Sequence, residues 1–205
     1  MKRLLLVRHG ESEANVVHSL DCTVPGPPLS PLGHKQAIGL VDALSGMDIR
    51  TIYASTMLRA QQTVAPLAQK LGLRVHVRDG FREFDVGDLN ARSDRESHLL
   101  LDELMRRWLV AHEATAARPD GENAAEVIAR FRSALVDVLA SYDDGAAVVA
   151  AHGGALRLVV PELKCGVTGP FTFVNHVPNA GIIDVEVSGD QLKCRSWAGL
   201  SVVQR

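Results

Sequence analysis

Two histidines in this sequence occupy matching positions, each just after a short apolar run and directly before glycine. His9 follows the run at residues 4–7 through Arg8, and His152 follows the run at residues 146–151. A continuous apolar run of this length is typical of a strand buried on both faces, as in a parallel sheet. Because ligands of open α/β sheets bind at the carboxyl ends of such strands, we expect both imidazoles at one site.

Two arginines join the histidines at this expected site. Arg8 is the neighbour of His9, and Arg59 opens a predicted helix that follows a second apolar strand. A guanidinium group can bind two phosphate oxygens at once, and it stabilises the charge of a phosphoryl group in transfer. A neutral imidazole can attack phosphorus near neutral pH. Each side chain alone would suit a structural or solvated role, but together they indicate phosphoryl transfer on a histidine.

The elements that must hold these residues alternate between strand and helix. A helix is predicted to begin at Ser30 and Pro31, because serine is a favoured N-cap and proline suits the first helical position. Beyond it, strands are predicted at residues 51–54, 74–77 and 146–151, and helices at residues 56–71, 98–117, 124–139 and 155–164. This alternation predicts an α/β fold of three layers, α/β/α, with a mostly parallel central sheet.

Two segments depart from the alternation. Residues 171–198 carry alternating apolar and polar side chains around Gly189 and Asp190, which predicts a β-hairpin. Residues 79–120 combine an irregular stretch with one predicted helix, and we expect them to form a cap-like helical insertion over the strand ends. The length fits a single domain over residues 1–205.

Composition and charge exclude several classes of protein. The chain has 22 basic and 24 acidic residues and a net charge of -2, with no basic run that would indicate a nucleic-acid surface. No apolar stretch approaches the roughly 20 residues of a membrane-spanning helix. The three cysteines form no CxxC pair, so they indicate neither a disulfide framework nor a zinc site. We therefore expect a cytoplasmic protein with no nucleic-acid or membrane partner, and leave a homodimer open.

Five segments resemble, in order, the motifs of the histidine phosphatase superfamily, branch 1, which includes the phosphoglycerate mutases. They are Arg8-His9-Gly10-Glu11-Ser12, Leu29 to Gly33 with Gln36-Ala37, Ser55 to Thr63, Gly121-Glu122, and His152-Gly153-Gly154 with Arg157. The first motif alone is a weak signal, but five in the same order over residues 8–157 are specific. The resemblance implies a phosphoglycerate mutase-like fold and chemistry through phosphohistidine.

The resemblance also implies a role for each matching residue. His9 is expected to be the nucleophile, and Glu83 the acid that protonates the leaving alkoxide and then, as a base, activates water. The expected phosphate ligands are Arg8, Asn15, Arg59, His152 and the backbone N–H of Gly153. No cofactor and no metal are expected, because arginine and histidine supply the positive charge that Mg²⁺ supplies in other phosphoryl-transfer sites.

One departure from the family pattern leaves the acid open. After the acid the family usually has glycine, an aromatic residue and Glu-Gly, whereas this chain has Gly-Asp-Leu-Asn at residues 87–90. Asp85 or Asp88 therefore stays an alternative to Glu83 as the proton donor. A surface ion pair between Glu83 and Arg82 is a further interpretation, in which Glu83 takes no part in the reaction.

Three functions fit these residues, and their ligand in each case is a small phosphorylated molecule. A phosphatase that hydrolyses a phosphomonoester is favoured, because the segments with which mutases bind the substrate carboxylate are not found. Arg106 and Arg107 form a basic pair, but a solvated helix face explains them. The alternatives are a phosphoglycerate mutase-type isomerase and an inactive phospho-ligand-binding protein. Residues 16–28 and 84–120 are expected to determine specificity.

Overall fold

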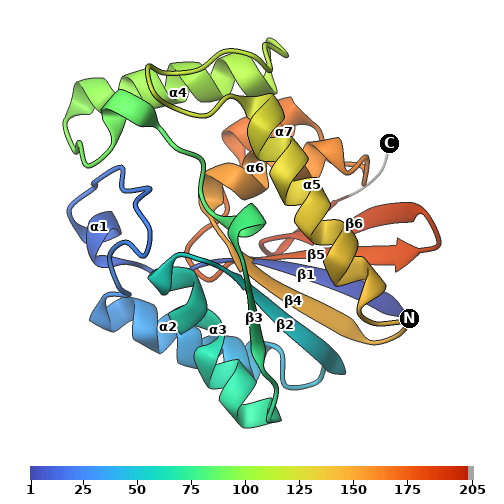
Figure 1. Ribbon diagram of the computed structural model, residues 1–205. Helices are drawn as coiled ribbons and strands as arrows, with labels where there is room; N and C mark the ends of the chain where they lie inside the picture. The colour runs from blue at the N-terminus through green and yellow to red at the C-terminus, as the bar shows by residue number, and fades with distance from the viewer. Residues whose placement is uncertain (203–205) are drawn as a thin grey trace.

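The computed structural model describes residues 1–202 as a seven-stranded sheet between two layers of helices (Figure 1). The strand order is β3-β2-β4-β1-β5-β6-β7. The parallel strands are β3 (Val75–Arg78), β2 (Ile49–Ser55), β4 (Ala146–Ala151) and β1 (Lys2–Arg8). The antiparallel strands are β5 (Ile182–Ser188), β6 (Gln191–Trp197) and β7 (Leu200–Ser201). The expected three-layer α/β fold is confirmed, with its parallel strands at the centre and at one edge of the sheet.

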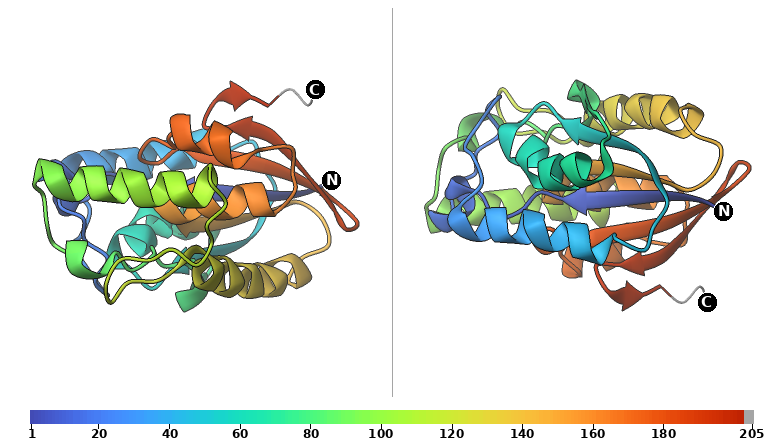
Figure 2. Two further views of the ribbon diagram at one scale, coloured as in Figure 1. Left: turned by 90° about the horizontal axis from the view of Figure 1, so that it is seen from above. Right: turned by 90° about the horizontal axis from the view of Figure 1, so that it is seen from below.

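The central strand β1 shows why its sequence is apolar throughout. Leu4 and Leu6 belong to the apolar cluster on one face of the sheet, whereas Leu5 and Val7 belong to the cluster on the other face. One face is covered by α2 (Pro31–Ala43) and α3 (Leu58–Leu71), and the other by α5 (Ala124–Ala140) and α6 (Gly153–Glu162) (Figure 2). A strand covered on both sides needs apolar residues at every position.

The register of the parallel strands aligns their carboxyl ends. Arg8 at the end of β1 pairs with Ala151 at the end of β4, and β2 ends beside them with Ala54 opposite Ala150. The chain therefore leaves neighbouring strands at one edge of the sheet. The catalytic candidates that follow β1, β2 and β4 in the sequence begin from the same place in space.

The helix starts follow from local sequence signals. Ser30 caps α2 by accepting a hydrogen bond from the N–H of Gly33 at 3.0 Å, and Pro31 occupies the first turn, as predicted. Asn123 and Glu126 form a reciprocal capping box at the start of α5. Among residues 1–202, none of these or the other helices is both long and apolar enough to cross a membrane.

A group of short elements lies over the carboxyl ends of the parallel strands. They are α1 (Glu13–Val16), η1 (Asp79–Phe81), η2 (Gly87–Leu89) and α4 (Arg95–Leu109), with α4 packed against α7 (Gly169–Val174) (Figure 1). Phe84 and Trp108 anchor this layer through edge-to-face contact, with ring centroids 5.0 Å apart. Their separate apolar cluster, joined by residues from α5 and α6, holds α4 over the end of the sheet.

Two predicted elements are wrong in extent. The helix expected at residues 98–117 begins earlier, because Asp94 caps its first turn, and it ends at Leu109; His112 beyond it adopts a left-handed backbone with φ of 58°. The hairpin expected over residues 171–198 covers only β5 and β6. Residues 171–174 instead belong to α7, whose N-cap Thr168 accepts a hydrogen bond from the N–H of Phe171.

Candidate active site

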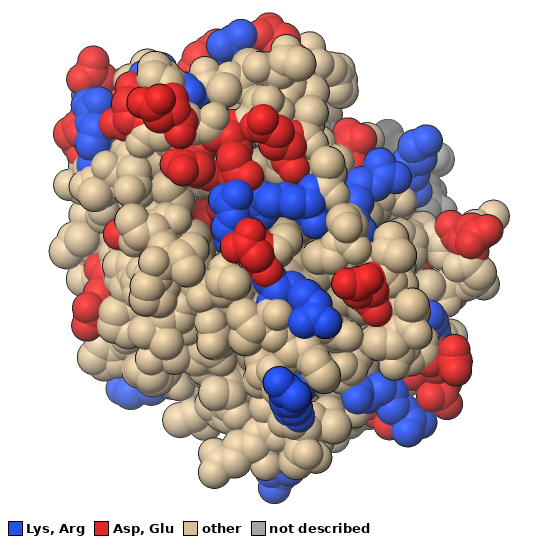
Figure 3. Space-filling model, viewed as in Figure 1, with Lys and Arg blue, Asp and Glu red and all other residues tan. Residues whose placement is uncertain are grey.

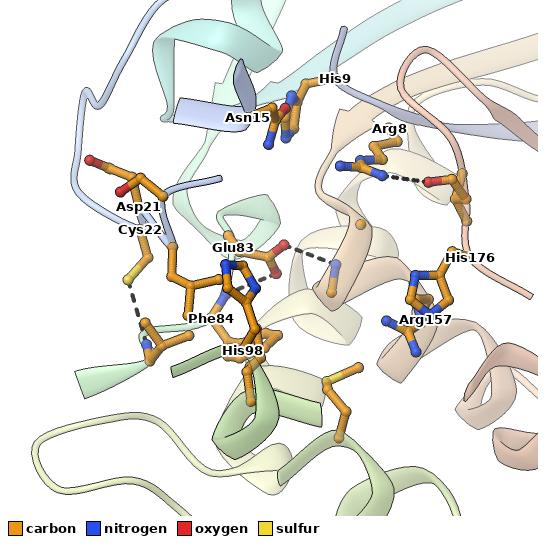
Figure 4. A pocket seen from close by; sticks show the side chains of 18 of the residues that line it. Arg8, His9, Asn15, Asp21, Cys22, Glu83, Phe84, His98, Arg157 and His176 are labelled. Atoms are coloured by element: carbon orange, nitrogen blue, oxygen red, sulfur yellow. Dashed lines mark hydrogen bonds between the residues drawn. The ribbon is translucent and has the colours of Figure 1, made fainter. Parts of the chain in front are cut away.

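A cavity of about 310 Å³ opens at the carboxyl ends of the parallel strands (Figure 4). Its walls include the predicted site residues Arg8, His9, Asn15, Arg59, Glu83 and Gly153. The remaining predicted residue, His152, lies directly behind this wall, with its ring centroid 5.1 Å from that of His9. The structure therefore brings together side chains that are up to 144 positions apart in the sequence (8 to 152).

His9 is held with one ring nitrogen directed at this site. Nδ1 donates to the carbonyl oxygen of Gly10 at 2.7 Å, which leaves the lone pair on Nε2. Nε2 accepts a hydrogen bond from Nε of Arg59 at 3.3 Å. Burial lowers the pKa of His9 well below its ordinary value, and the charges of Arg59 and Arg8 lower it further. A neutral ring with an unprotonated Nε2 is the state that a nucleophile requires.

His152 presents its other ring nitrogen to the same region. Its Nε2 lies 2.8 Å from Oγ of Ser55, which itself accepts a hydrogen bond from the N–H of Met57. If the hydroxyl of Ser55 donates to Nε2, the ring proton of His152 is on Nδ1, where it can be donated to an anion. Ser55 was not predicted as a site residue, although it is the last residue of β2 and opens the third motif.

Arg8 and Arg59 are both anchored by backbone carbonyl groups. Nη1 of Arg8 donates to the carbonyl oxygen of Val177 at 2.7 Å, and Nη2 of Arg59 donates to that of Asp21 at 3.0 Å (Figure 4 shows the first). Burial lowers the pKa of both guanidinium groups, while the carboxylate of Glu83 acts in the opposite direction. Arginine nevertheless stays protonated in proteins, so two fixed positive charges face the cavity.

Three buried nitrogen atoms at this end have no hydrogen-bond partner among residues 1–202: Arg8 Nε, Arg59 Nη1 and His152 Nδ1. Buried polar groups are nearly always hydrogen-bonded, so three exceptions around His9 indicate a ligand with several acceptor atoms. Phosphate oxygens fit such donors. Gly153 keeps this wall open, because a Cβ atom there would lie 3.1 Å from Nε of Arg8.

Asn15 is oriented by a residue that sequence analysis missed. Oδ1 of Asn15 accepts hydrogen bonds from the N–H of Ser12 and from Nδ2 of Asn179, which also donates to the carbonyl oxygen of His9. With its oxygen occupied, Asn15 has its NH₂ group left to donate into the cavity. Asn179 lies in the turn before β5, where no apolar pattern or motif singles it out.

Glu83 lies over the N-terminus of α6. Its carboxylate accepts backbone hydrogen bonds from Gly154 at 2.9 Å and Ala155 at 2.7 Å (Figure 4 shows the first). These bonds fix it beside the end of the cavity lined by Arg8, His9 and Gly153, the expected phosphate-binding end. Gly154 makes this approach possible, since a Cβ atom there would lie 2.4 Å from Phe84 and 3.0 Å from the Glu83 carboxylate. Steric contact with Phe84 and Glu83 thus explains why the second residue after His152 is glycine.

The alternative interpretations of the acid find no support in the geometry. Arg82 pairs with Glu122 at 2.8 Å rather than with Glu83. Asp85 accepts a hydrogen bond from the N–H of Gly87, and Asp88 is paired with Arg118. The hydrogen bond from Arg118 lowers the pKa of Asp88, which is unfavourable for a proton donor. Neither aspartate is among the described residues that line the cavity, whereas Glu83 is.

Comparison with known proteins places this site in a family. The sequence model of the histidine phosphatase superfamily (branch 1) matches residues 4–199. The protein is a histidine phosphatase superfamily member. A protein of Hydrogenobacter thermophilus, provisionally named phosphoserine phosphatase 2, is 31% identical over 93% of this chain and 92% of its own. The glucosyl-3-phosphoglycerate phosphatase of Mycobacterium tuberculosis is 29% identical over 79% of this chain and 75% of its own.

Solved structures resemble this histidine phosphatase in fold. A mycobacterial glucosyl-3-phosphoglycerate phosphatase in complex with VO₃ superposes with a TM-score of 0.82, at 24% identity, over 97% of this chain and 99% of its own. Sequence relatives also include a protein of Enterobacter sp., provisionally named phosphoglycerate mutase GpmB, which is 31% identical over 80% of this chain and 75% of its own. The expected family and fold are confirmed.

The far end of the cavity differs in character from the phosphate-binding end. Its wall comes from the segment at residues 19–22, from α4, from α6 and from the segment before β5. Its residues include Leu20, His98, Leu101, Asp102, Met105, Arg157 and His176. Arg157 is anchored by the carbonyl oxygens of Thr172 and Phe173, at 2.8 Å each. The two segments expected to determine specificity, residues 16–28 and 84–120, both contribute to this wall.

Arg106 and Arg107 lie away from this wall of the histidine phosphatase. Arg106 pairs with Glu103 and Arg107 with Glu113, all partly exposed, so the solvated interpretation of this pair holds. On the face shown in Figure 3, acidic and basic side chains are interspersed rather than gathered into one large patch of a single sign.

Proposed function

We propose that this protein is a phosphatase that hydrolyses a small phosphomonoester through a phosphohistidine on Nε2 of His9. The proposal rests on three buried nitrogens, from Arg8, Arg59 and His152, that have no partner among residues 1–202. They surround a neutral histidine whose Nε2 carries no proton. This arrangement supplies a nucleophile on one side of a phosphoryl group and charge-assisted donors on its oxygens.

In the first step, the Nε2 lone pair of His9 attacks phosphorus, and the bond from phosphorus to the ester oxygen breaks. Arg8, Arg59 and His152 stabilise the charge on the three non-bridging oxygens. Glu83 gives its proton to the departing oxygen, so that an alcohol leaves rather than an alkoxide. The product of this step is the phosphoenzyme and a Glu83 carboxylate.

In the second step, water replaces the alcohol beside Glu83. The carboxylate takes a proton from water as the oxygen attacks phosphorus, and the bond from phosphorus to Nε2 breaks. Inorganic phosphate leaves, Nε2 regains its lone pair and Glu83 is again protonated. One water molecule is consumed in each cycle, and no other reactant is required.

The cavity limits the substrate to a small molecule. Its volume of about 310 Å³ is at the lower end of the range for ligand pockets, and part of it is taken by the phosphoryl group. The relatives named for phosphoserine and for glucosyl-3-phosphoglycerate suggest these two compounds as the first substrates to test.

The deciding experiment combines turnover with isolation of the intermediate. Purified protein is given phosphoserine, glycerol phosphate or p-nitrophenyl phosphate with a chelator present, and phosphate release is measured. We expect release from at least one ester, and a rapidly quenched sample should contain an acid-labile, base-stable phosphoprotein. His9→Ala should lose both, whereas His34→Ala, an exposed control on α2, should keep both. Wild-type turnover by His9→Ala would contradict the proposal.

The mutase alternative is tested with 3-phosphoglycerate. A phosphatase releases phosphate from it or leaves it unchanged, whereas a mutase returns 2-phosphoglycerate after the phosphoryl group passes back to the other hydroxyl. Interconversion that is faster than phosphate release, measured on the same sample, would replace the phosphatase by the mutase.

Three further expectations belong to the proposal. We propose that the enzyme acts in the cytoplasm on a soluble substrate, and that residues 1–205 form one domain with residues 79–120 as its cap. The homodimer stays a prediction, to be measured by light scattering of the purified protein.

A further inference from the structure

Three charged side chains form a compact cluster beside the active site, outside the cavity. Glu122, just before α5, receives two hydrogen bonds of 2.8 Å from Arg82 and bonds of 2.9 and 3.0 Å from Arg130 on α5. All three side chains are largely buried, with 24% of Arg82, 15% of Glu122 and 16% of Arg130 exposed. Burial alone would raise the pKa of Glu122, but the bonds from Arg130 and from the backbone of Asp85 lower it overall.

The same cluster forms hydrogen bonds with the backbone on both sides of Glu83. Nη1 of Arg130 donates to the carbonyl oxygens of Gly80 at 3.0 Å and Arg82 at 2.9 Å, and its Nη2 donates to that of Glu83 at 3.2 Å. Glu122 accepts the N–H of Asp85 at 3.0 Å. This stretch has no sheet partner, so these side chains make contacts that a neighbouring strand would otherwise provide.

We propose that Arg130 and Glu122 are positioning residues for the general acid, and hold the backbone of residues 82–85 so that the Glu83 carboxylate stays over the N-terminus of α6. The inference rests on the proposed role of Glu83. Arg130 itself does not line the cavity among the described residues, so it acts through the backbone rather than on the substrate.

This arrangement gives the cluster a function that packing alone would not require. A guanidinium group bound to one carboxylate needs two of its five N–H groups. Arg130 uses the other three on the carbonyl oxygens of Gly80, Arg82 and Glu83, all in one irregular segment. Loss of such a clamp lets the carboxylate move, and a shift of about 1 Å at a reacting group can cost on the order of 10²-fold in rate.

The test exploits the need of the leaving group for a proton. Glycerol phosphate, an alkyl ester, requires a general acid to protonate its leaving alkoxide, whereas p-nitrophenyl phosphate releases p-nitrophenolate, a stable anion that needs no proton. The contrast applies to the first step alone, because Glu83 activates water in the second step for both esters. In single-turnover measurements, Arg130→Met should therefore lower the rate of phosphohistidine formation from the alkyl ester by about ten- to a hundredfold, up to the lower end of the 10²–10⁴ that a general acid contributes. The same rate from the aryl ester should fall by no more than about threefold.

Glu122→Gln provides a second variant, which keeps the shape of the side chain and removes its charge, in case Arg130→Met does not fold. Arg132→Met is the matched control, since Arg132 lies exposed on the same helix. It should match the wild type on both esters. Glu83→Gln should reproduce the alkyl-specific loss and exceed it.

The outcomes separate this inference from the proposed function. In folded Arg130→Met and Glu122→Gln, an equal loss in the rate of phosphohistidine formation from both esters would show a merely structural role and overturn the inference. The inference is also overturned if both variants keep the wild-type ratio of the alkyl-ester rate to the aryl-ester rate, while phosphohistidine still forms on His9. If the wild-type protein forms no phosphohistidine, the proposed function itself fails.

Discussion

The two ends of the cavity are built on different principles. At the phosphate-binding end, Arg8, His9 and His152 sit at or directly after the ends of strands buried on both faces, and His152 and His9 are 0% and 4% exposed. At the far end, His98 and Asp102 come from a helix of the cap, and their side chains face the cavity from its more exposed wall.

Under the proposed function, this contrast separates the groups that react from the groups that select the substrate. The sheet fixes the position of each group at the phosphate-binding end, because a shift of one strand would disturb two apolar clusters at once. Helix α4 of the proposed cap is held by its own apolar cluster and by loops, so it can change without moving the groups that follow β1, β2 and β4. The first end should therefore respond to substitution in rate, and the second in substrate preference.

The largest effect is expected from Arg59→Met at the phosphate-binding end. The change removes the bond to Nε2 of His9 and one of the unpartnered donors, while retaining a similar volume. Loss of one preorganised charged donor costs about 10²–10³ in kcat. Steady-state rates on p-nitrophenyl phosphate measure it, with Arg74→Met, exposed before β3, as control. A loss below tenfold would mean that Arg59 does not contact the phosphoryl group.

A smaller loss is expected when a methyl group is added beside the acid. Gly154→Ala places Cβ against Phe84 and the Glu83 carboxylate, so Glu83 must move away from the N-terminus of α6. We expect roughly a 10²-fold lower kcat on an alkyl ester. Gly39→Ala is the matched control in α2, where an added Cβ meets nothing within 4 Å; it should keep full activity and gain about 0.5–1 kcal/mol of stability.

The buried histidines also predict how stability depends on pH. Burial, followed by the charge of Arg59, lowers the pKa of both His9 and His152 in the folded protein well below about 6.5, their ordinary value. Below that pH the unfolded chain binds protons that the folded chain does not. The free energy of unfolding should therefore fall as the pH drops below about 6.5, by up to ~1.4 kcal/mol per pH unit for each histidine, and stay level above it.

Urea unfolding of the wild type and of His152→Asn checks this expectation. It is measured between about pH 5 and pH 8, a range that spans the ordinary histidine pKa of about 6.5. The variant should show a shallower slope on the acid side, and His34→Asn, exposed on α2, should keep the wild-type slope. Identical slopes for all three proteins would mean that His152 is protonated in the folded state as readily as in the unfolded chain.

The smallest effect should come from the cap. Asp102→Asn removes one negative charge from the far wall, at an exposed position where charge interactions are worth at most about 1 kcal/mol. We expect the ratio of kcat/KM between anionic and neutral leaving groups to rise severalfold, with phosphohistidine formation from p-nitrophenyl phosphate unchanged. Glu103→Gln, one residue further along α4, should leave the ratio as it was.

Sequence patterns predicted the parallel core because its inner strands, β1, β2 and β4, are covered on both faces and are therefore mostly apolar. For the same reason the groups that follow β1, β2 and β4 could be expected at one site. The error at residues 98–117 has a local cause. The segment after Leu109 keeps helix-forming residues, but the left-handed backbone at His112 and the bond from Trp108 to the carbonyl oxygen of Ala116 turn it into a loop.

The parts of the site that escaped prediction are those made by tertiary contacts between exposed polar segments. Asn179 orients Asn15 from 164 positions away in the sequence. No motif or apolar pattern around Asn179 indicates a role in the site. The residues of α4 at the far wall face the cavity only because the apolar cluster around Trp108 sets the rotation of that helix. Sequence periodicity predicts which faces are buried, but it does not predict which partner a polar side chain in a loop will contact.

The turn before β5 has a consequence for biosynthesis. Val177 anchors Arg8, Asn179 orients Asn15, and β5 itself pairs with β1 on the side opposite β4. A nascent chain on the ribosome therefore carries its nucleophile from the first ten residues but cannot complete the phosphate cradle until residues 175–188 have emerged. Completion of the proposed site therefore waits for the synthesis of β5 and the turn before it, long after the segment that carries His9 has been made.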